Sequence, residues 1–304
     1  MRHKKGNPIN GWLVIDKPLN MTSTDVVRAV RRDLKPQKLG HAGTLDPLAS
    51  GILPIGMGEA TKTMPYIVDS SKVYEFEVTW GQERNTDDLE GKISNQSDKR
   101  PSEQDISKIL PTFVGKIIQT PPKFSAIKIN GQRAFKLARE GKKINIPPRV
   151  VTVFELKNIS NDLIINSNLL ITSSFQVTCG KGTYVRSLAR DMGRLLGVYG
   201  FVSKLRRLRV GPFVLKNAIS LELLNELSHS APARDYVLPV MTALDDILAL
   251  AVTESEAKLI KNGQPLHIPN SAEGKAVLTL NEVLIALVEI KHEIAQPFRI
   301  FNLA

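Results

Sequence analysis

The sequence predicts an α+β protein with one large domain, residues 1–236, and a small C-terminal domain, residues 237–304. Strand and helix signals alternate irregularly along its 304 residues, without the regular strand–helix period of a Rossmann fold or a barrel. Residues 73–80 alternate strictly between apolar and polar side chains, as in a half-buried strand. After Pro232 the chain becomes acidic and rich in small aliphatic residues, which predicts a domain boundary there.

The first elements are a strand and a capped helix. Gly11–Ile15 predicts a short strand, and Thr22–Asp25 offers helix caps ahead of the apolar positions Val26, Val27 and Val30. Basic residues are frequent in this helix and in the loop after it. They form either a solvent-exposed face or a phosphate-binding surface. These residues are Arg28, Arg31, Arg32, Lys35 and Lys38.

The middle of the chain predicts a sheet with two further helices. In the alternating strand, Tyr74 heads an apolar row and is most simply a core residue. Ser102–Asp105 caps a helix, and a short basic helix is predicted to stop at Gly141. The remaining predicted strands are Phe124–Ile129, Val150–Ile159, Leu163–Ile171 and Ser173–Cys179.

The charge of the chain favours a polyanionic partner. The formal net charge is +11 and the isoelectric point is about 9.7. Residues 231–304 hold six Lys and Arg against nine Asp and Glu, a net charge of −3, so residues 1–230 carry +14. The phosphate-binding surface is therefore expected in the large domain.

Cysteine and histidine usage gives no sign of a metal centre. The lone Cys179 excludes an intramolecular disulfide and fits a reducing compartment, and the five histidines show no metal-ligand spacing. No stretch approaches the ~20 apolar residues of a membrane span. We expect a cytoplasmic protein with no metal and no membrane segment.

One acid lies in an unusual setting. The segment from Gly40 to Pro54 begins G-H-A-G-T-L-D-P-L-A-S-G and places Asp46 between leucines and before a proline. Taken alone, Asp-Pro in a glycine-rich stretch is most often a turn or a helix cap. A carboxylate among so many apolar neighbours also suits the floor of a site, because an unpaired buried charge is costly.

A second segment, Gly180–Leu188, is predicted to lead from a strand into a helix. Arg186, Arg190 and Arg194 recur every four residues along that helix, either as solubilising charge or as partners for carboxylates in the sheet. Positive charge at a helix N-terminus is unfavourable, so Arg186 needs a partner such as Asp46. Leu205–Val210 mixes apolar and basic residues and predicts an edge strand whose arginines face solvent or RNA.

Seven motifs, taken in order, resemble the TruB family of bacterial tRNA pseudouridine-55 synthases. The Asp46 loop is the most specific of them, and the resemblance covers most of the chain. The other six are Gly11–Pro18, Gly56–Lys62, Val73–Glu75, Phe124–Lys128, Gly182–Arg186 and Leu205–Leu208.

The resemblance implies a fold and an activity. The expected fold is that of the pseudouridine synthases: a mixed, mainly antiparallel sheet with flanking helices and a central cleft, followed by a small PUA-like β domain. The expected reaction isomerises uridine 55 in the T loop of tRNA, without a cofactor, after the base has been flipped out. Asp46 would act as the nucleophile, as a stabiliser of cationic character at C1′, or as the base that takes the C2′ proton.

The resemblance also assigns the other site residues. Arg186 would orient Asp46, and Tyr74 would stack on the uracil and could help remove the C5 proton. His41 would fill the gap left by the flipped base, whereas without the motif it would be an ordinary loop histidine. The remaining expected substrate-site residues are Leu205 in the base pocket, Lys17 beneath the active-site strands, and Gly43 and Thr44 in the loop.

The chain departs from the family at one loop. Where the family has T-D-T-x-D-x-x-G, residues 84–91 read R-N-T-D-D-L-E-G, so Arg84 and Asn85 replace a threonine and an acid. The replacements predict that an RNA contact of this loop differs from that of the family. Three hypotheses stay open: a monomeric enzyme acting on the tRNA T stem-loop, an RNA-binding or chaperone protein with a vestigial site, and a pseudouridine synthase acting on another RNA.

Overall fold

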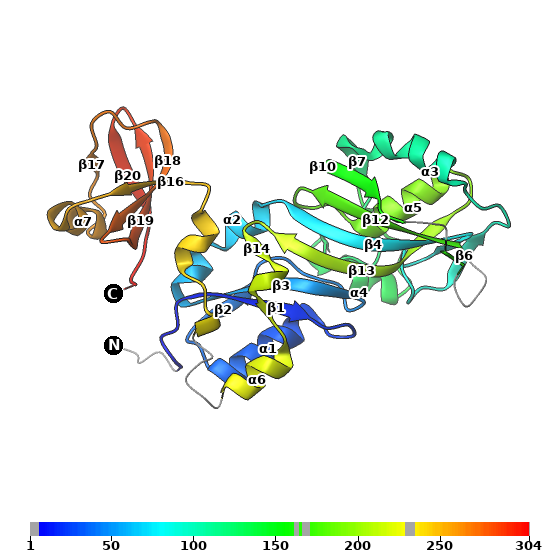
Figure 1. Cartoon of the computed structure of the whole chain (residues 1–304), viewed down its shortest axis with the longest axis horizontal. Helices are drawn as coiled ribbons and strands as arrows, with labels where there is room; N and C mark the ends of the chain where they lie inside the picture. Colours follow the sequence, from blue (N-terminus) through cyan, green and yellow to red (C-terminus); the bar gives the residue numbers. More distant parts are fainter. Residues whose placement is uncertain (1–5, 161–163, 166–170, 229–234, 304) are drawn as a thin grey trace.

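The computed structural model describes residues 6–160, 164–165, 171–228 and 235–303. Figure 1 shows a large lobe built around one long twisted sheet and a smaller β lobe formed by the C-terminal residues. This is the predicted α+β class, with mainly antiparallel pairing.

The main sheet has eleven strands within the described residues. Its pairing is antiparallel except where β1 meets β15 and where β3 meets β13. In spatial order the strands are β15 (Ala218–Ile219), β1 (Gly11–Lys17), β3 (Ala49–Met57), β13 (Gly200–Val210), β4 (Lys72–Trp80), β12 (Ile171–Cys179), β10 (Arg149–Asn158) and β7 (Gly115–Gln119). Beside this path, β2 (Leu39–His41) pairs with β3, β11 (Ile164–Ile165) with β12, and β14 (Phe213–Val214) with β13.

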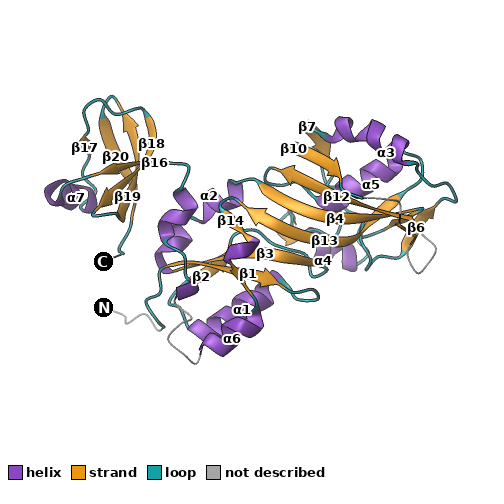
Figure 2. Cartoon of the chain, viewed as in Figure 1, coloured by secondary structure: helices purple, strands orange, loops and turns teal. Residues whose placement is uncertain are grey.

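Helices cover the sheet in two groups (Figure 2). Helices α1 and α6 pack on β1 and β3 through residues such as Val26, Val30 and Leu224. Helix α5 packs its apolar stripe, including Leu188 and Met192, on the β4 row that contains Phe76, Val78 and Trp80. The α-helices are α1 (Ser23–Leu34), α2 (Met64–Asp69), α3 (Glu103–Ile109), α4 (Ala134–Arg139), α5 (Val185–Leu195), α6 (Leu221–Ser228) and α7 (Glu254–Lys261). Single 3-10 turns are η1 (Gly58–Lys62), η2 (Leu110–Phe113), η3 (Leu215–Asn217) and η5 (Val240–Leu244).

Both predicted N-terminal caps are present. Thr22 and Asp25 form a reciprocal capping box on α1, and Ser102 and Asp105 form one on α3. In each box the hydroxyl accepts a hydrogen bond from the third helical amide, while the Asp side chain accepts from the cap residue's amide. These local contacts fix where the two helices begin.

The small lobe is a five-stranded sheet on which α7 packs through Ala257 and Ile260. In order, its strands are β16 (Leu248–Ala251), β18 (Gly274–Leu280), β19 (Val283–Lys291), β20 (Ile294–Ile300) and β17 (Leu266–His267). It shares a hydrophobic cluster with the large lobe, in which Trp12 and Phe213 join Val240, Leu287 and Phe301. The two lobes therefore pack on one another.

Two predicted strands differ from the structure. The prediction of an edge strand at Leu205–Val210 was wrong, because β13 lies inside the sheet between β3 and β4 and Arg207 is fully buried. Within Phe124–Ile129, only Lys128–Ile129 form a strand (β8), which pairs with β9 (Gln132–Arg133). The preceding carbonyls accept hydrogen bonds from outside any strand ladder, for example that of Phe124 from Arg186. The predicted strand at 163–171 lies largely outside the described residues.

Candidate active site

Asp46 lies on the loop that joins β2 to β3. Side chains from outside this loop form hydrogen bonds with its backbone. The hydroxyl of Ser23 accepts a hydrogen bond from the Leu45 amide at 2.9 Å and donates to the Leu45 carbonyl at 3.2 Å. Buried Lys17 donates to the Pro47 carbonyl at 3.4 Å. Gly43 and Gly51 both have φ near +100°, a conformation that favours glycine. The backbone on both sides of Asp46 is therefore fixed.

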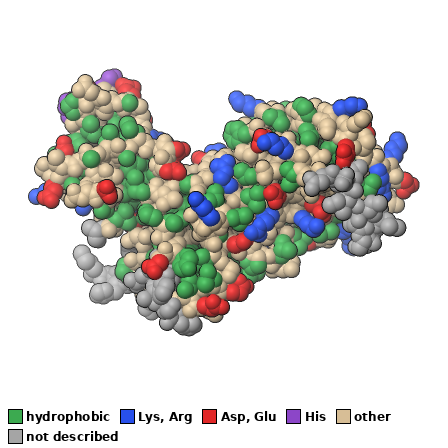
Figure 3. Space-filling model, viewed as in Figure 1, with side chains coloured by type: hydrophobic (Ala, Val, Ile, Leu, Met, Phe, Trp, Pro, Cys, Tyr) green, Lys and Arg blue, Asp and Glu red, His purple; other side chains and the backbone are tan. Residues whose placement is uncertain are grey.

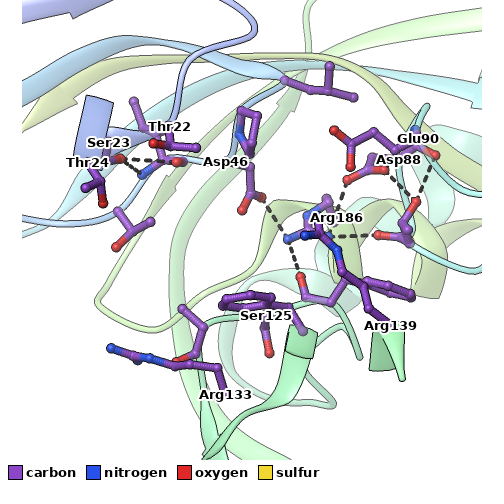
Figure 4. A pocket seen from close by; sticks show the side chains of 18 of the residues that line it. Thr22, Ser23, Thr24, Asp46, Asp88, Glu90, Ser125, Arg133, Arg139 and Arg186 are labelled. Atoms are coloured by element: carbon purple, nitrogen blue, oxygen red, sulfur yellow. Dashed lines mark hydrogen bonds and ion pairs between the residues drawn. The ribbon is translucent and has the colours of Figure 1, made fainter. Parts of the chain in front are cut away.

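The predicted contact between Asp46 and Arg186 is present (Figure 4). Nη2 of Arg186 lies 2.8 Å from Oδ2 of Asp46, and it also donates to the Phe124 carbonyl at 3.0 Å. Nη1 of Arg186 donates to the Thr86 carbonyl at 2.8 Å and lies 3.3 Å from Oδ2 of Asp88. The Arg186 side chain is only 5% exposed, whereas that of Asp46 is 38% exposed. A buried cation thus holds a carboxylate that stays open to solvent on one side.

Residues 84–91 supply the second carboxylate of this cluster. Asp88 accepts hydrogen bonds from the Thr86 hydroxyl and the Glu90 amide, and burial raises the pKa of its carboxyl. Arg84, which replaces the family threonine, donates to two carbonyls of its own loop and stacks 4.6 Å from the Phe201 ring. Asn85 accepts a hydrogen bond from the Lys92 amide. In this structure both replacements therefore make contacts that close the loop carrying Asp88.

The other two arginines of α5 also pair with acids from strand β5 (Gln82–Arg84) and the residues after it. Nη1 of Arg190 lies 2.9 Å from Oδ2 of Asp87, and both side chains are buried. Arg194 makes a bidentate contact with Glu83 at 2.6 and 2.9 Å. All three arginines of α5 therefore pair with acids. Arg186 and Arg190 are buried and do not serve as solubilising charge, whereas the Arg194 side chain is 54% exposed.

Two cavities meet at Asp46. The first, of about 470 Å³, is lined by His41, Thr44, Asp46 and Arg186, with Arg133 and Arg139 on its far side (Figure 4). The second, of about 330 Å³, shares Thr44, Asp46 and Arg186 with the first. It adds Gly43, Tyr74 and Leu205, together with Lys72, Arg149 and Arg207. Lys17 lines neither cavity.

Tyr74 lies between the core and a cavity. Its ring packs against the core cluster beneath α5, and it also lines the second cavity. Burial raises the pKa of its phenol, and the nearby Arg207 guanidinium opposes that rise by charge and hydrogen bonding. The phenol therefore carries its proton at neutral pH.

Three basic groups in or near the cavities have lowered pKa values. Burial lowers the pKa of Lys17 to about 8, against an opposing effect of Asp46, and it likewise lowers the pKa of Lys72 to about 8. Burial also lowers the pKa of His41, with a smaller contribution from Arg207. Sequence reasoning missed Lys72, Arg149 and Arg207 as cavity residues. Of these three residues, only Lys72 could have been suggested by the sequence. It lies two residues before Tyr74, and side chains two residues apart in a strand point to the same face.

Clusters of metal-ligating side chains and membrane-spanning helices are both absent from the described residues. No group of three or more His, Cys, Asp or Glu side chains there could hold a metal ion. No helix in that part of the chain is long and apolar enough to cross a membrane.

Comparison with solved structures places the fold. The chain of a Cbf5–Nop10–Gar1 complex superposes with a TM-score of 0.72 at 23% identity, covering 96% of this chain and 85% of that one. A chain of an H/ACA RNP bound to a substrate RNA containing 2′-deoxyuridine gives 0.73 at 21% identity, covering 99% and 91%. At these identities the likeness establishes the architecture of the chain.

Comparison of sequences establishes the family. Residues 31–185 match the model of the TruB family pseudouridylate synthase N-terminal domain, and residues 186–248 match that of the tRNA pseudouridylate synthase B C-terminal domain. The tRNA pseudouridine synthase B of Rhizobium johnstonii is 47% identical over 99% of this chain and 98% of its own length. That of Caulobacter vibrioides is 45% identical, covering 99% of each. The chain belongs to the TruB family of pseudouridylate synthases.

Proposed function

We propose that this chain isomerises uridine 55 in the T loop of tRNA to pseudouridine, with Asp46 as its essential carboxylate. The observation that carries the proposal is the half-open Asp46 carboxylate, held 2.8 Å from a buried guanidinium where two cavities meet. The printed names of relatives 43–47% identical to the chain support tRNA as the substrate.

The chemistry needs a carboxylate and no external reagent. The N1–C1′ bond breaks, the uracil turns, and a C5–C1′ bond forms, while C5 loses its hydrogen and N1 gains one. The change involves no net oxidation and no phosphoryl transfer. Asp46 serves this reaction as nucleophile, as stabiliser of cationic character at C1′, or as acceptor of the C2′ proton, and all three routes require its ionised form.

The second cavity suits a flipped uracil. Tyr74 offers an aromatic face and Leu205 an apolar wall beside Asp46, with Gly43 and Thr44 forming the edge nearest the loop. We assign His41, in the first cavity, to the space that the base leaves in the RNA. Lys17 supports the loop through its contacts with the carbonyls of Pro18, Met21 and Pro47.

RNA binding belongs mainly to the large lobe. Lys and Arg side chains spread over this lobe (Figure 3), and its cleft is bordered by Arg133, Phe135 and Arg139. Guanidinium groups suit phosphates, and an aromatic ring suits a stacked base. The T stem-loop is the RNA element that we assign to this cleft.

We also propose the domain organisation, the oligomeric state and the location of the enzyme. We place the catalytic domain at residues 1–236 and a PUA-like domain at 237–304, and we propose that the enzyme acts as a monomer in the cytoplasm. The buried lone thiol of Cys179 supports a reducing compartment. The hydrophobic cluster shared by the two lobes argues that they work as one body.

Mapping the product tests the proposed function. The full chain is incubated with an unmodified tRNA transcript, and pseudouridines are then located by carbodiimide treatment and reverse transcription. We expect one new stop, at position 55, and none when that uridine is replaced by cytidine. Stops at other uridines would assign the enzyme to another target. Binding without any pseudouridine would support the RNA-binding hypothesis instead.

A further inference from the structure

A buried guanidinium lies beneath the Asp46 loop. Arg207 projects from β13, and it is 1% exposed. Its Nε donates to the Ile52 carbonyl at 2.7 Å and its Nη2 donates to the Gly43 carbonyl at 3.1 Å. Among the described residues no carboxylate forms a salt bridge with it, although fifteen other ion pairs are present.

The two carbonyls that Arg207 contacts lie on either side of Asp46, one in its loop and the other in strand β3. Gly43 lies three residues before Asp46 and Ile52 lies six residues after it. Between them, Gly51 approaches the Arg207 backbone so closely that an added Cβ would lie 2.2 Å from the Arg207 carbonyl oxygen. The Arg207 side chain therefore links the segments before and after Asp46.

The same residue connects the loop to Tyr74. Arg207 lies directly opposite Tyr74 in the pairing of β13 with β4, and both line the second cavity with Asp46. The Arg207 guanidinium also acts on the Tyr74 phenol through charge and hydrogen bonding. Arg207 thus contacts the loop that carries Asp46. It also lies beside Tyr74, which lines the second cavity.

A structural role alone does not explain a cation here. Burying a guanidinium without a carboxylate partner is unfavourable, and apolar residues of similar volume often replace buried charges without loss of stability. What a guanidinium adds is a rigid fork whose donors reach two fixed acceptors at once. A fork of this kind suits the need to hold catalytic groups at a fixed separation, where a displacement of about 1 Å can cost about 10²-fold in rate.

We propose that Arg207 is a positioning residue, which holds the chain on both sides of Asp46, at Gly43 and at Ile52, so that the carboxylate and the Tyr74 ring face one another across the base cavity. The proposal rests on the proposed function and adds a residue to it. It makes Arg207 act through Asp46 and Tyr74 rather than on the RNA directly.

The test compares Arg207→Gln with Arg206→Gln. Arg206 is the adjacent residue on the opposite face of the strand, where it pairs with Asp16 at 2.7 Å and donates to the Ser50 hydroxyl at 3.3 Å. We expect Arg207→Gln to lower the single-turnover rate by about 10²-fold, with tRNA affinity within about threefold of wild type. We expect Arg206→Gln to keep the wild-type rate.

Amide hydrogen exchange supplies a readout that does not depend on activity. The amides of Ala42, Leu45 and Ala49 are hydrogen-bonded within or beneath the loop. In Arg207→Gln we expect these amides to exchange faster, while those of β10 and β12 exchange as in wild type. Faster exchange throughout the main sheet would show general destabilisation and would overturn the positioning role, as would a single-turnover rate within about threefold of wild type.

A second variant covers the case in which Arg207→Gln does not fold. Arg207→Lys keeps the charge but loses the planar fork, so we expect an intermediate rate and loop exchange faster than in wild type. A wild-type rate with unchanged loop exchange in Arg207→Lys would overturn the positioning role. If wild type itself forms no pseudouridine, the proposed function fails, and the exchange comparison still decides whether Arg207 holds the loop.

Discussion

Asp46→Asn is expected to lower the rate of pseudouridine formation by roughly 10⁴-fold or more, equivalent to about 5 kcal/mol of activation free energy. The amide can neither attack C1′, nor stabilise its positive charge, nor take a proton from C2′. Affinity for tRNA should stay within about threefold of wild type, because the proposed role of the Asp46 carboxylate is in bond breaking and not in binding phosphates.

The fold should tolerate this change. Arg186 keeps Asp88 and the carbonyls of Thr86 and Phe124 when the Asp46 charge is removed. Single-turnover assays, filter binding and urea unfolding on the same preparation separate the three quantities. Turnover near the wild-type rate in a folded Asp46→Asn protein would remove Asp46 from the chemistry.

Arg186→Met is the second change with a large expected effect. Its loss leaves Asp46 and Asp88 facing one another without the cation that lies between them, and removing one partner of a buried ion pair costs about 3–5 kcal/mol of stability. We expect a comparable loss in urea unfolding, together with a fall of at least about 10²-fold in single-turnover rate, because the carboxylate is no longer oriented.

Two variants act as controls for Arg186. Arg186→Lys keeps the charge, but a single ammonium cannot reproduce the fork that serves Asp46, Asp88 and two carbonyls, so its rate should also fall well below wild type. Arg194→Gln removes the half-exposed arginine two turns along the same helix, whose partner is Glu83. It should leave the rate unchanged. Equal losses of rate in Arg194→Gln and Arg186→Met would indicate that helix α5 matters as a whole and not through Arg186.

Local signals predicted the elements that depend on local contacts. The capping boxes at Thr22 and Ser102 follow from residues three apart, and the β4 row follows from strict alternation. The position of a strand within a sheet has no such local signal. The basic residues of Leu205–Val210 suggested an edge strand, although parallel pairing with β3 places this strand inside the sheet.

The site residues also differ in whether the local sequence could reveal them. Asp46 and Arg186 were predicted because each is out of place locally, one as an acid among leucines and the other as a cation at a helix N-terminus, and the family resemblance linked them. Arg207 could not be found from the sequence. An arginine within a basic stretch suggests solvent exposure, and the carbonyls of Gly43 and Ile52 that it contacts lie more than 150 residues away.

The hydrogen on C5 of the target uridine reports on the isomerisation itself. Purified protein comprising residues 1–304 is mixed, in EDTA and without any nucleotide or redox cofactor, with an unmodified T-arm stem-loop carrying tritium at that position. Because C5 becomes the carbon bonded to C1′, we expect the tritium to be released into water as the uridine is converted. Tritium that stays on the RNA while the stem-loop is demonstrably bound would contradict the proposed isomerisation.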